Sequence, residues 1–544
     1  MNTKGLVILL IAGCVIALPF IFRRPQEAGD WKPDDPVLVI ITPHNEAIRH
    51  EFARGFSQWH QTHYGKPVKI DWRIIGGTTE IMRYLASEYE ASAGQAIRNA
   101  ARKGITLTRE AAMRQDAPDA VTCRIDLFFG GGTYDHGKAE RQGLTVPAWE
   151  TPPPGLFTDE DGAPLIPERL SGEVWCGKAF YGNVLSTFGI CYNTDRLRDL
   201  GITKPPASWD DLTAPQYAGQ VGVADPTKSG SVAKAFEMMI HAACAKRVAA
   251  AGFTRSQIDA FEKGETEPPP AYQAAIEAGW ADGIRLVRRI GANARYFTDS
   301  AGKVPVDVSS GVTAAGIAID FFGRLQSELA AKRPDGSSVM GYVTPVGGSS
   351  VSADPISLLR GAPHRELAVR FITFVLGPDG QKLWNYRVGE PGGPDRFDLR
   401  RLPIRRDFYP SADPERNKRF LAHQPHLTDP LGDPDCDVYR LAESFVYYPR
   451  WTSRHFGIQR DLIRALCMDS GDELHAAWSA ILAHGGPDKQ PEAMRLLEAL
   501  PDDPEPMTWQ TILSVYNEIP RLERLRRWTD FFRKQYDAAR KAVR

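Results

Sequence analysis

The sequence is poor in cysteine and has no excess of charge of either sign. Seven cysteines among 544 residues include no CxxC pair, which excludes a disulfide-rich scaffold, a zinc ribbon and a thioredoxin-type redox site. Lys and Arg number 66 against 67 Asp and Glu, so no overall electrostatic field attracts nucleic acid or anionic lipid. We therefore expect no nucleic-acid partner.

The signatures of catalysis are also missing. The chain contains no GxSxG elbow, no HExxH, no GxxxxGK[ST] phosphate loop and no Rossmann or kinase fingerprint. Asp and Glu are abundant, but no pair has a spacing that singles it out for acid–base work. We predict that the protein is not an enzyme and needs no cofactor. A membrane-tethered hydrolase with an unrecognised site remains an alternative.

One long apolar run interrupts the otherwise mixed composition. Gly5–Phe22 is eighteen residues without a charge, which is long enough for a transmembrane anchor helix. Ile11–Cys14 also resembles a lipobox, in which Cys14 would be lipidated, and a cleaved signal peptide is a third interpretation. All three place the rest of the chain outside the cytoplasmic membrane. In that oxidising compartment Cys176 and Cys191 could form a disulfide or remain free thiols.

Strand, turn and helix alternate after a Pro/Asp-rich spacer that ends at residue 36. The hydrophobic patterns predict strands at 37–41, 68–75, 125–129, 221–224 and 315–319. Helices are predicted at 46–63, from about residue 80 with a Thr cap, from 231, and at 366–375. This order is typical of an α/β protein with parallel strands and right-handed crossovers. The polar, Ala-rich stretch 90–115 predicts an inserted helical hairpin.

From about residue 411 onward the pattern predicts helices only. The last of them carries an apolar stripe and a basic composition, with nine Lys and Arg against three Asp and Glu in Arg521–Arg544. Such a helix either lies on a lipid surface or packs its stripe against the α/β body, and we favour packing against the α/β body. The stripe consists of Leu522, Leu525, Trp528, Phe531 and Tyr536.

Candidate ligand-binding residues collect where predicted strands end and helices begin. Ligands of open α/β sheets bind at these junctions, because helix N-termini present unpaired N–H groups and a positive dipole end. Glycine allows close backbone approach, and Ser and Thr add hydroxyl donors. The candidates are His44, Asn45, Gly77, Thr78, Gly131, Gly132, Ser229, Gly230, Ser231, Asp320 and Phe321.

Several of the same segments carry a family resemblance. IIGGTTE, VADPTKSGSVAKAFEMMI, GIAIDFFGR and GEPGGPDRFDLRRLPIRRDFY resemble the extracellular solute-binding proteins of ABC importers (family 1), above all the branch labelled ferric-iron transport. The resemblance runs from about residue 37 to 409. It implies a two-lobed periplasmic-binding-protein type 2 fold. A monomer of this kind would capture a small molecule and deliver it to ABC permease subunits on the periplasmic side.

The resemblance also suggests a division of the chain into lobes. We expect a signal or membrane anchor and spacer at 1–36, lobe 1 at 37–140 with its return at 319–410, and lobe 2 at 141–318. An all-helical C-terminal extension follows at 411–544, which the resemblance does not explain.

The iron ligands of that branch do not carry over. Ferric members typically bind the metal through two adjacent tyrosines, a histidine and a glutamate. His44 stands at the histidine position, but the glutamate position falls in Gly130-Gly131 and the tyrosine pair falls within 320–322, where Phe321 has no oxygen. We therefore expect a phosphate- or phosphonate-like organic anion, with Asp320 facing an amine or sugar hydroxyls. Ferric iron is the alternative ligand.

Overall fold

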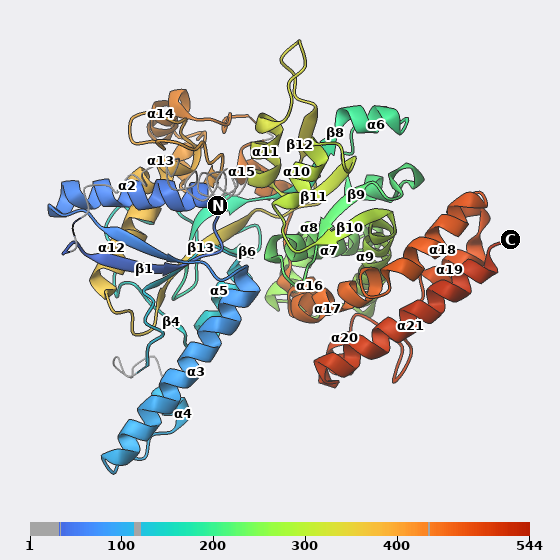
Figure 1. Cartoon of the computed structure of the whole chain (residues 1–544), viewed down its shortest axis with the longest axis horizontal. Helices are drawn as coiled ribbons and strands as arrows, with labels where there is room; N and C mark the ends of the chain where they lie inside the picture. The colour runs from blue at the N-terminus through green and yellow to red at the C-terminus, as the bar shows by residue number, and fades with distance from the viewer. Residues whose placement is uncertain (1–31, 33, 114–120, 434–435) are drawn as a thin grey trace, which may run out of the picture.

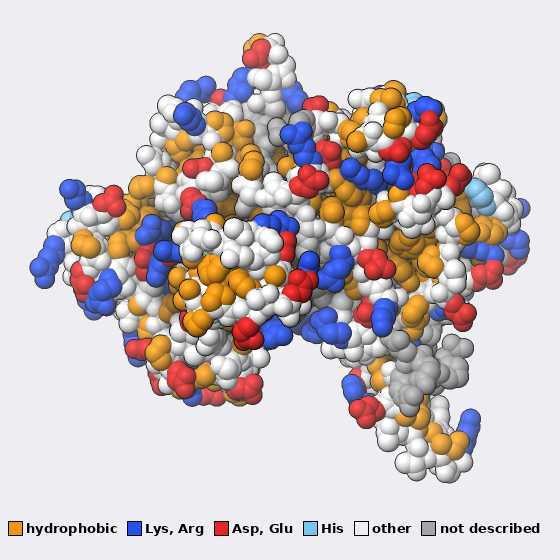
Figure 2. All heavy atoms as spheres, turned by 180° about the vertical axis from the view of Figure 1, so that it is seen from behind, with side chains coloured by type: hydrophobic (Ala, Val, Ile, Leu, Met, Phe, Trp, Pro, Cys, Tyr) orange, Lys and Arg blue, Asp and Glu red, His pale blue; other side chains and the backbone are white. Residues whose placement is uncertain are grey.

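The computed structural model describes residues 32, 34–113, 121–433 and 436–544. The predicted anchor at 5–22 and the lipobox at Cys14 lie outside these ranges. Within them, no helix combines the length and the apolar character needed to cross a bilayer. Charged side chains of both signs are interspersed over the face shown in Figure 2, in keeping with the balanced composition.

The first of two sheets is built mainly from strands near the beginning of the chain. Its strand order is β14-β7-β13-β3-β1-β2, with β4 beside β13. β1, next to the edge strand β2, pairs in parallel with β2 and β3, whereas β13 runs antiparallel to β3 and β7. The strands are β1 (Val37–Ile41), β2 (Lys69–Arg73), β3 (Leu127–Phe129), β4 (Thr145–Val146), β7 (Tyr181–Ser186), β13 (Ser352–Leu359) and β14 (Leu402–Pro403).

The helices that accompany this sheet follow its strands along the chain. The apolar faces of α2 and α12 bury a cluster of aromatic side chains against the sheet, including Phe52, Phe56 and Phe371. The helices are α2 (Glu46–Tyr64), α3 (Thr78–Arg102), α4 (Arg109–Ala112), α5 (Thr133–Arg141), α12 (Arg365–Leu376) and α13 (Pro378–Asn385). The two-stranded pair β5 (Arg169–Leu170) and β6 (Glu173–Val174) precedes β7.

The second sheet has the order β10-β9-β11-β8-β12. Its strands are β8 (Phe188–Asn193), β9 (Val221–Ala224), β10 (Ala294–Thr298), β11 (Ala315–Ile319) and β12 (Met340–Val343). Its helices are α6 (Thr194–Asp199), α7 (Gly230–Ala250), α8 (Arg255–Lys263), α9 (Pro270–Asn293), α10 (Lys303–Ser309) and α11 (Asp320–Leu329). The two sheets and their helices form two lobes side by side (Figure 1).

The chain passes between the lobes at two places next to these sheets. β7 leads through Thr187 directly into β8, and β12 returns to β13 through residues 344–351. By sheet membership the first lobe therefore holds residues 37–186 and 352–409, and the second holds 188–343. The ranges expected from sequence differ, because they put β7 in lobe 2 and α11 and β12 in the return of lobe 1.

The described residues beyond 411 form helices without a named strand. They are α14 (Pro414–His423), α15 (Val438–Ser444), α16 (Pro449–Thr452), α17 (Phe456–Cys467), α18 (Gly471–Ala483), α19 (Pro491–Leu497), α20 (Thr511–Ser514) and α21 (Arg521–Ala542). Figure 1 shows α14 beside α13 at the first lobe, α17 near the middle of the molecule beside α16, and α18, α19 and α21 on the outer side of the second lobe. We call residues 411–544 the extension.

The last helix, α21, packs its apolar side against other helices of the extension. Trp528, Phe532 and Tyr536 of α21 are buried, and Tyr536 donates its hydroxyl to the Leu466 carbonyl of α17 at 2.9 Å. The sequence analysis favoured packing over a lipid surface, but the stripe packs on other helices of the extension and not on the α/β body as expected. The predicted stripe was wrong in part, because Leu522 is 80% exposed and Phe532 takes the place expected for Phe531.

The structure decides between the two alternatives left open for Cys176 and Cys191. Both are free thiols, and burial raises the pKa of Cys176 and of Cys191 to about 12. Cys176 lies next to β7 of the first sheet and Cys191 lies in β8 of the second, so free thiols and not a disulfide are what the structure shows.

The inserted segment is also not a simple hairpin. α3 continues as one helix to Arg102, projecting from the body, and only the short α4 lies beside it (Figure 1). The N-cap of α3 is Gly77, so the predicted Thr cap is wrong.

Candidate functional site

A cavity of about 1030 Å³ lies between the lobes, and helices from both lobes begin at its wall. The N-terminal residues of α2, α3 and α5 from the first lobe and of α7 and α11 from the second line it. The first turn of each helix carries N–H groups that have no partner within the helix, and the dipole adds a partial positive charge there. Their convergence creates an environment suited to an anion.

The helices differ in how their first turns are capped. Asn45 caps α2 by accepting the Ile48 N–H at 3.1 Å, and Ser229 caps α7 by accepting the Val232 N–H at 3.3 Å. The N-caps of α3 and α5 are Gly77 and Gly132, and neither supplies a side-chain cap. In α5 the Asp135 N–H donates to the Gly132 carbonyl at 3.1 Å, and no side chain at the N-cap of α3 or α5 competes with a ligand for the other first-turn N–H groups.

Glycines let the two lobes approach closely at the rim of the cavity. A Cβ on Gly77 would lie 2.9 Å from the Lys228 carbonyl oxygen of the opposite lobe, and one on Gly230 would lie 3.1 Å from Thr78 Oγ1. Gly131 has a φ of +101°, and a Cβ there would lie 2.3 Å from Thr78 Cγ2. Side chains at these positions would hold the lobes apart or displace Thr78.

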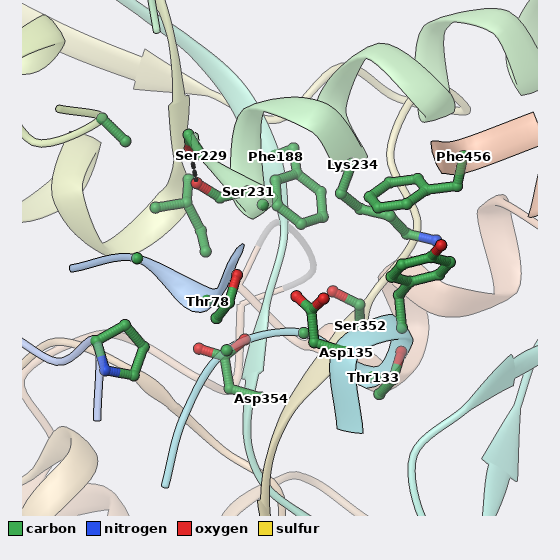
Figure 3. Close-up of a pocket in the computed structure, with 18 of the residues that line it drawn as sticks. Thr78, Thr133, Asp135, Phe188, Ser229, Ser231, Lys234, Ser352, Asp354 and Phe456 are labelled. Carbon is green, nitrogen blue, oxygen red and sulfur yellow. Dashed lines mark hydrogen bonds between the residues drawn. The ribbon is translucent and has the colours of Figure 1, made fainter. Parts of the chain in front are cut away.

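Hydroxyl groups surround the same space (Figure 3). Ser229 Oγ and Ser231 Oγ lie 3.1 Å apart on the α7 side, while Thr78, Thr133 and Ser352 come from the first lobe. Hydroxyls rotate to donate or accept as a ligand requires. The wall can therefore add side-chain hydrogen bonds to those of the helix amides.

Asp135 and Asp354 are two of the carboxylates that line the cavity, and sequence reasoning missed both. Burial raises the pKa of Asp135 and of Asp354, although Arg401 opposes the effect at Asp354. Arg401 Nη2 lies 2.5 Å from Asp354 and 2.7 Å from Ser186 Oγ, and its guanidinium stacks over Phe321 at 4.2 Å. The carboxylates are suited to accept hydrogen bonds from hydroxyl or amine groups.

The extension supplies part of the wall. Lys234 of α7 lies 3.0 Å from both Glu173 and Glu237 and 3.9 Å from the centre of the Tyr447 ring. Burial by itself lowers the pKa of Lys234, but these two glutamates outweigh it and raise that pKa. Tyr447 and Phe456 of the extension thus face the cavity together with residues of both lobes. Because the family resemblance ended at residue 409, nothing in the sequence pointed to them.

Nearly all candidates chosen from sequence lie at this wall. His44, Asn45, Gly77, Thr78, Gly131, Gly132, Ser229, Gly230, Ser231 and Phe321 line the cavity, and Asp320 does not. Asp320 is 2% exposed; it accepts the Thr187 N–H at 3.1 Å and the Phe321 N–H at 2.8 Å. Its carboxylate turns back to the β7–β8 crossover, so it holds the hinge and does not face an amine or sugar hydroxyls.

His44 sits at the wall but is enclosed by aromatic rings. Phe129 lies 4.6 Å and Trp384 6.1 Å from its ring centre, and neither ring nitrogen has a hydrogen-bond partner among the described residues. Burial lowers the pKa of His44 well below its usual value, so the ring is neutral. Within the described ranges, no group of three or more His, Cys, Asp or Glu is placed to hold a metal ion.

Comparison with known proteins agrees with the resemblance drawn from the sequence. Residues 155–403 match the family model described as bacterial extracellular solute-binding protein. The resemblance to that class is thereby confirmed for the central part of the chain. Among curated proteins, an uncharacterised protein of Haemophilus influenzae is 25% identical over 261 residues, which are 48% of this chain and 60% of that protein. The match thus spans less than two thirds of that relative.

The solved structures that match the chain include two binding proteins. The binding protein AfuA from Actinobacillus pleuropneumoniae, with fructose-6-phosphate bound, is 17% identical, covers 78% of this chain and 98% of its own, and has a TM-score of 0.47. The apo ferric ion-binding protein A of Pasteurella haemolytica is 12% identical over 78% and 98% of the chains, with a TM-score of 0.41.

Proposed function

We propose that this chain is the solute-binding component of an ABC importer, which captures a small organic anion between its lobes and delivers it to permease subunits. The observation that carries the proposal is the convergence of helix N-termini from both lobes on one cavity. The family match of residues 155–403 supports the transport class. The chain would work outside the cytoplasmic membrane, held there by residues 5–22 or by a lipid on Cys14.

The ligand that suits this wall is a phosphate- or phosphonate-like compound with a polar body. Its anionic group would lie among the first-turn amides of α3 and α7 and the hydroxyls of Thr78, Ser229 and Ser231. Asp135 and Asp354 take the place expected for Asp320 and would accept hydrogen bonds from the body of the ligand. No bond of the ligand is made or broken.

Capture follows from closure of the lobes. Groups from α3 and α7 can touch one ligand together only when the lobes are closed, so the ligand has a higher affinity for that state and shifts the population toward it. Gly77 and Gly230 are needed for this close approach. The closed form would then dock on the permease.

A thermal-shift screen of the purified full chain tests the proposal. The panel holds sugar phosphates, alkyl phosphonates, inorganic phosphate, spermidine and ferric citrate. A ligand present at 100 times its Kd stabilises the folded state by about 2.7 kcal/mol, so an organic phosphate or phosphonate should raise the melting temperature. Stabilisation by ferric citrate alone would favour iron as the ligand. Stabilisation by spermidine alone would reject the anion, and release of phosphate from the esters would favour the hydrolase.

A further inference from the structure

The extension makes a third connection between the two lobes, in addition to the two crossovers next to the sheets. Its first part rests on the first lobe, where Arg416 Nε donates to Asp159 at 2.9 Å and the Tyr439 hydroxyl donates to the Ile404 carbonyl at 2.6 Å. Its later helices rest on the second lobe, where Trp478 Nε1 donates to Asn293 at 2.8 Å. The chain crosses between these anchor points at about residues 445–449.

The crossing segment is fitted tightly to both lobes. The Tyr447 N–H donates to the Ser171 carbonyl at 2.9 Å on the first lobe, and its hydroxyl donates to Glu237 of α7 at 2.5 Å on the second. Gly172 has a φ of +85°, and a Cβ there would lie 1.7 Å from the Tyr447 carbonyl oxygen. Only glycine permits this contact, so the segment and the first lobe touch backbone to backbone.

Arg460 of α17 bonds to both lobes with one guanidinium. Nη2 donates to Thr79 Oγ1 of α3 at 2.8 Å and to the Thr227 carbonyl at 2.8 Å, and Nε donates to the Pro226 carbonyl at 2.6 Å. Thr79 belongs to the first lobe, while the two carbonyls belong to the loop between β9 and α7 of the second. The planar fork of arginine is suited to such divergent acceptors.

This contact lies at the rim of the cavity. Thr79 follows two residues after Gly77, and Thr227 directly precedes Lys228. The backbones of the two lobes meet at Gly77 and Lys228. The neighbouring Phe456 lines the cavity and packs on the Tyr134 ring of the first lobe, with ring centres 4.6 Å apart. Separation of the lobes would break these contacts together.

We propose that the extension is an intramolecular clasp that holds the two lobes closed, with Arg460 as its locking contact. The purpose of this clasp rests on the proposed function. The clasp keeps the ligand-free chain closed, and a ligand can enter only when Arg460 is released from Thr79. Because α17 is anchored to the second lobe, release at Thr79 breaks the hydrogen bond between α17 and α3, and the ring contact of Phe456 with Tyr134 can then part as the first lobe rotates about the β7–β8 crossover.

The separation of the lobes in the ligand-free full chain tests this clasp. Spin labels are placed at Arg83→Cys on α3 and Lys204→Cys of the second lobe, both exposed positions, and the distance is measured by electron–electron double resonance. The chain without the added cysteines gives the background from native thiols. We expect one narrow distance distribution in the parent and a shift to longer, broader distances in Arg460→Met, which keeps the apolar stem but loses the donors.

Arg464→Met is the matched control, because Arg464 lies one turn further along α17 and its guanidinium pairs with Asp469 at 3.2 Å. It should keep the parent distribution. Thr79→Val removes only the first-lobe acceptor and should lengthen the distance between the labels as Arg460→Met does. If Arg460→Met does not fold, the distance distribution of Thr79→Val tests the clasp instead. A parent-like distribution in Thr79→Val and in folded Arg460→Met would overturn the clasp. Since no ligand is present, failure of the ligand screen would leave this result unaffected.

Discussion

Ser229 and Ser231 form the part of the wall whose contribution can be measured most directly. Their hydroxyls lie 3.1 Å apart at the start of α7, and Ser229 accepts only one helix N–H. Both can therefore donate to an anion, and each lost hydrogen bond to a charged group costs about 1.5–3 kcal/mol. The two losses together cost about 3–6 kcal/mol, so we expect the double variant Ser229→Ala/Ser231→Ala to bind the ligand from the screen roughly 100-fold to 10,000-fold more weakly by calorimetry.

Thr254→Ala is the control for this pair. Thr254 caps α8 of the same lobe through the Gln257 N–H but does not line the cavity. Its loss should lower stability by about 1 kcal/mol and leave the affinity unchanged. Parent-like affinity in the double serine variant would remove α7 from the anion site.

The residues that sequence reasoning found are those whose role depends on local chain geometry. Glycine and hydroxyl residues between a strand and a helix, such as Gly77 and Ser229, are recognisable wherever the junction itself is. Asp354 and Arg401 are not, since they meet only because β13 and β14 both pair with β7. For Asp320 the sequence predicted the position after β11 but not the direction of the side chain. That direction depends on the hydrogen bond from the Thr187 N–H.

At the scale of elements, α21 is the helix whose burial is tested most easily. Trp528 is 1% exposed in the packing of α21 on the extension, whereas Leu522 on the same helix is 80% exposed. Replacing a buried tryptophan by alanine costs about 3–5 kcal/mol, and an exposed site costs about 0.5 kcal/mol or less. We expect Trp528→Ala to lower the urea midpoint strongly and Leu522→Ala to leave it nearly unchanged, as followed by far-ultraviolet circular dichroism. Equal midpoints would mean that α21 does not pack as described.

Elements with a simple apolar pattern were predictable, and those with buried charge were not. β1 and β9 have the predicted bounds, because each is a short apolar run between polar turns. On α21 the buried side includes Arg524, which pairs with Asp461 at 3.1 Å and is as buried as its partner. A charged residue inside the stripe breaks the periodicity, and the stripe was therefore placed one residue off at Phe531.

The arrangement of the whole molecule depends on where the chain changes lobe. β7 and β8 follow each other as one almost fully buried stretch, and only Thr187 separates a strand of one sheet from a strand of the other. No glycine or proline stands at that point, so the sequence could not place the boundary of the lobes. The crossing of the chain between the lobes at Tyr447 could not be predicted either, because its partners Ser171 and Glu237 are far away in the sequence.

Buried histidines make the stability of the whole chain depend on pH. Burial lowers the pKa of His136 in the first lobe to about 4 and that of His241 in the second to about 3. His241 Nε2 accepts the Tyr448 N–H of the extension at 2.9 Å, which requires the neutral ring. In the unfolded chain both titrate near pH 6.5. Between pH 6.5 and about 4 the unfolded chain therefore binds more protons, and acid favours unfolding.

Each of these histidines should remove about 2 kcal/mol of stability between pH 7 and pH 5, by the linkage between proton binding and folding. The free energy of unfolding in urea, measured at both pH values, checks this. His241→Gln cannot take up the proton, so its loss between the two pH values should be smaller than that of the parent. His484→Gln, at an exposed position, should lose as much as the parent. If His241→Gln were as acid-sensitive as the parent, protonation of His241 would not be what loosens the extension from the second lobe.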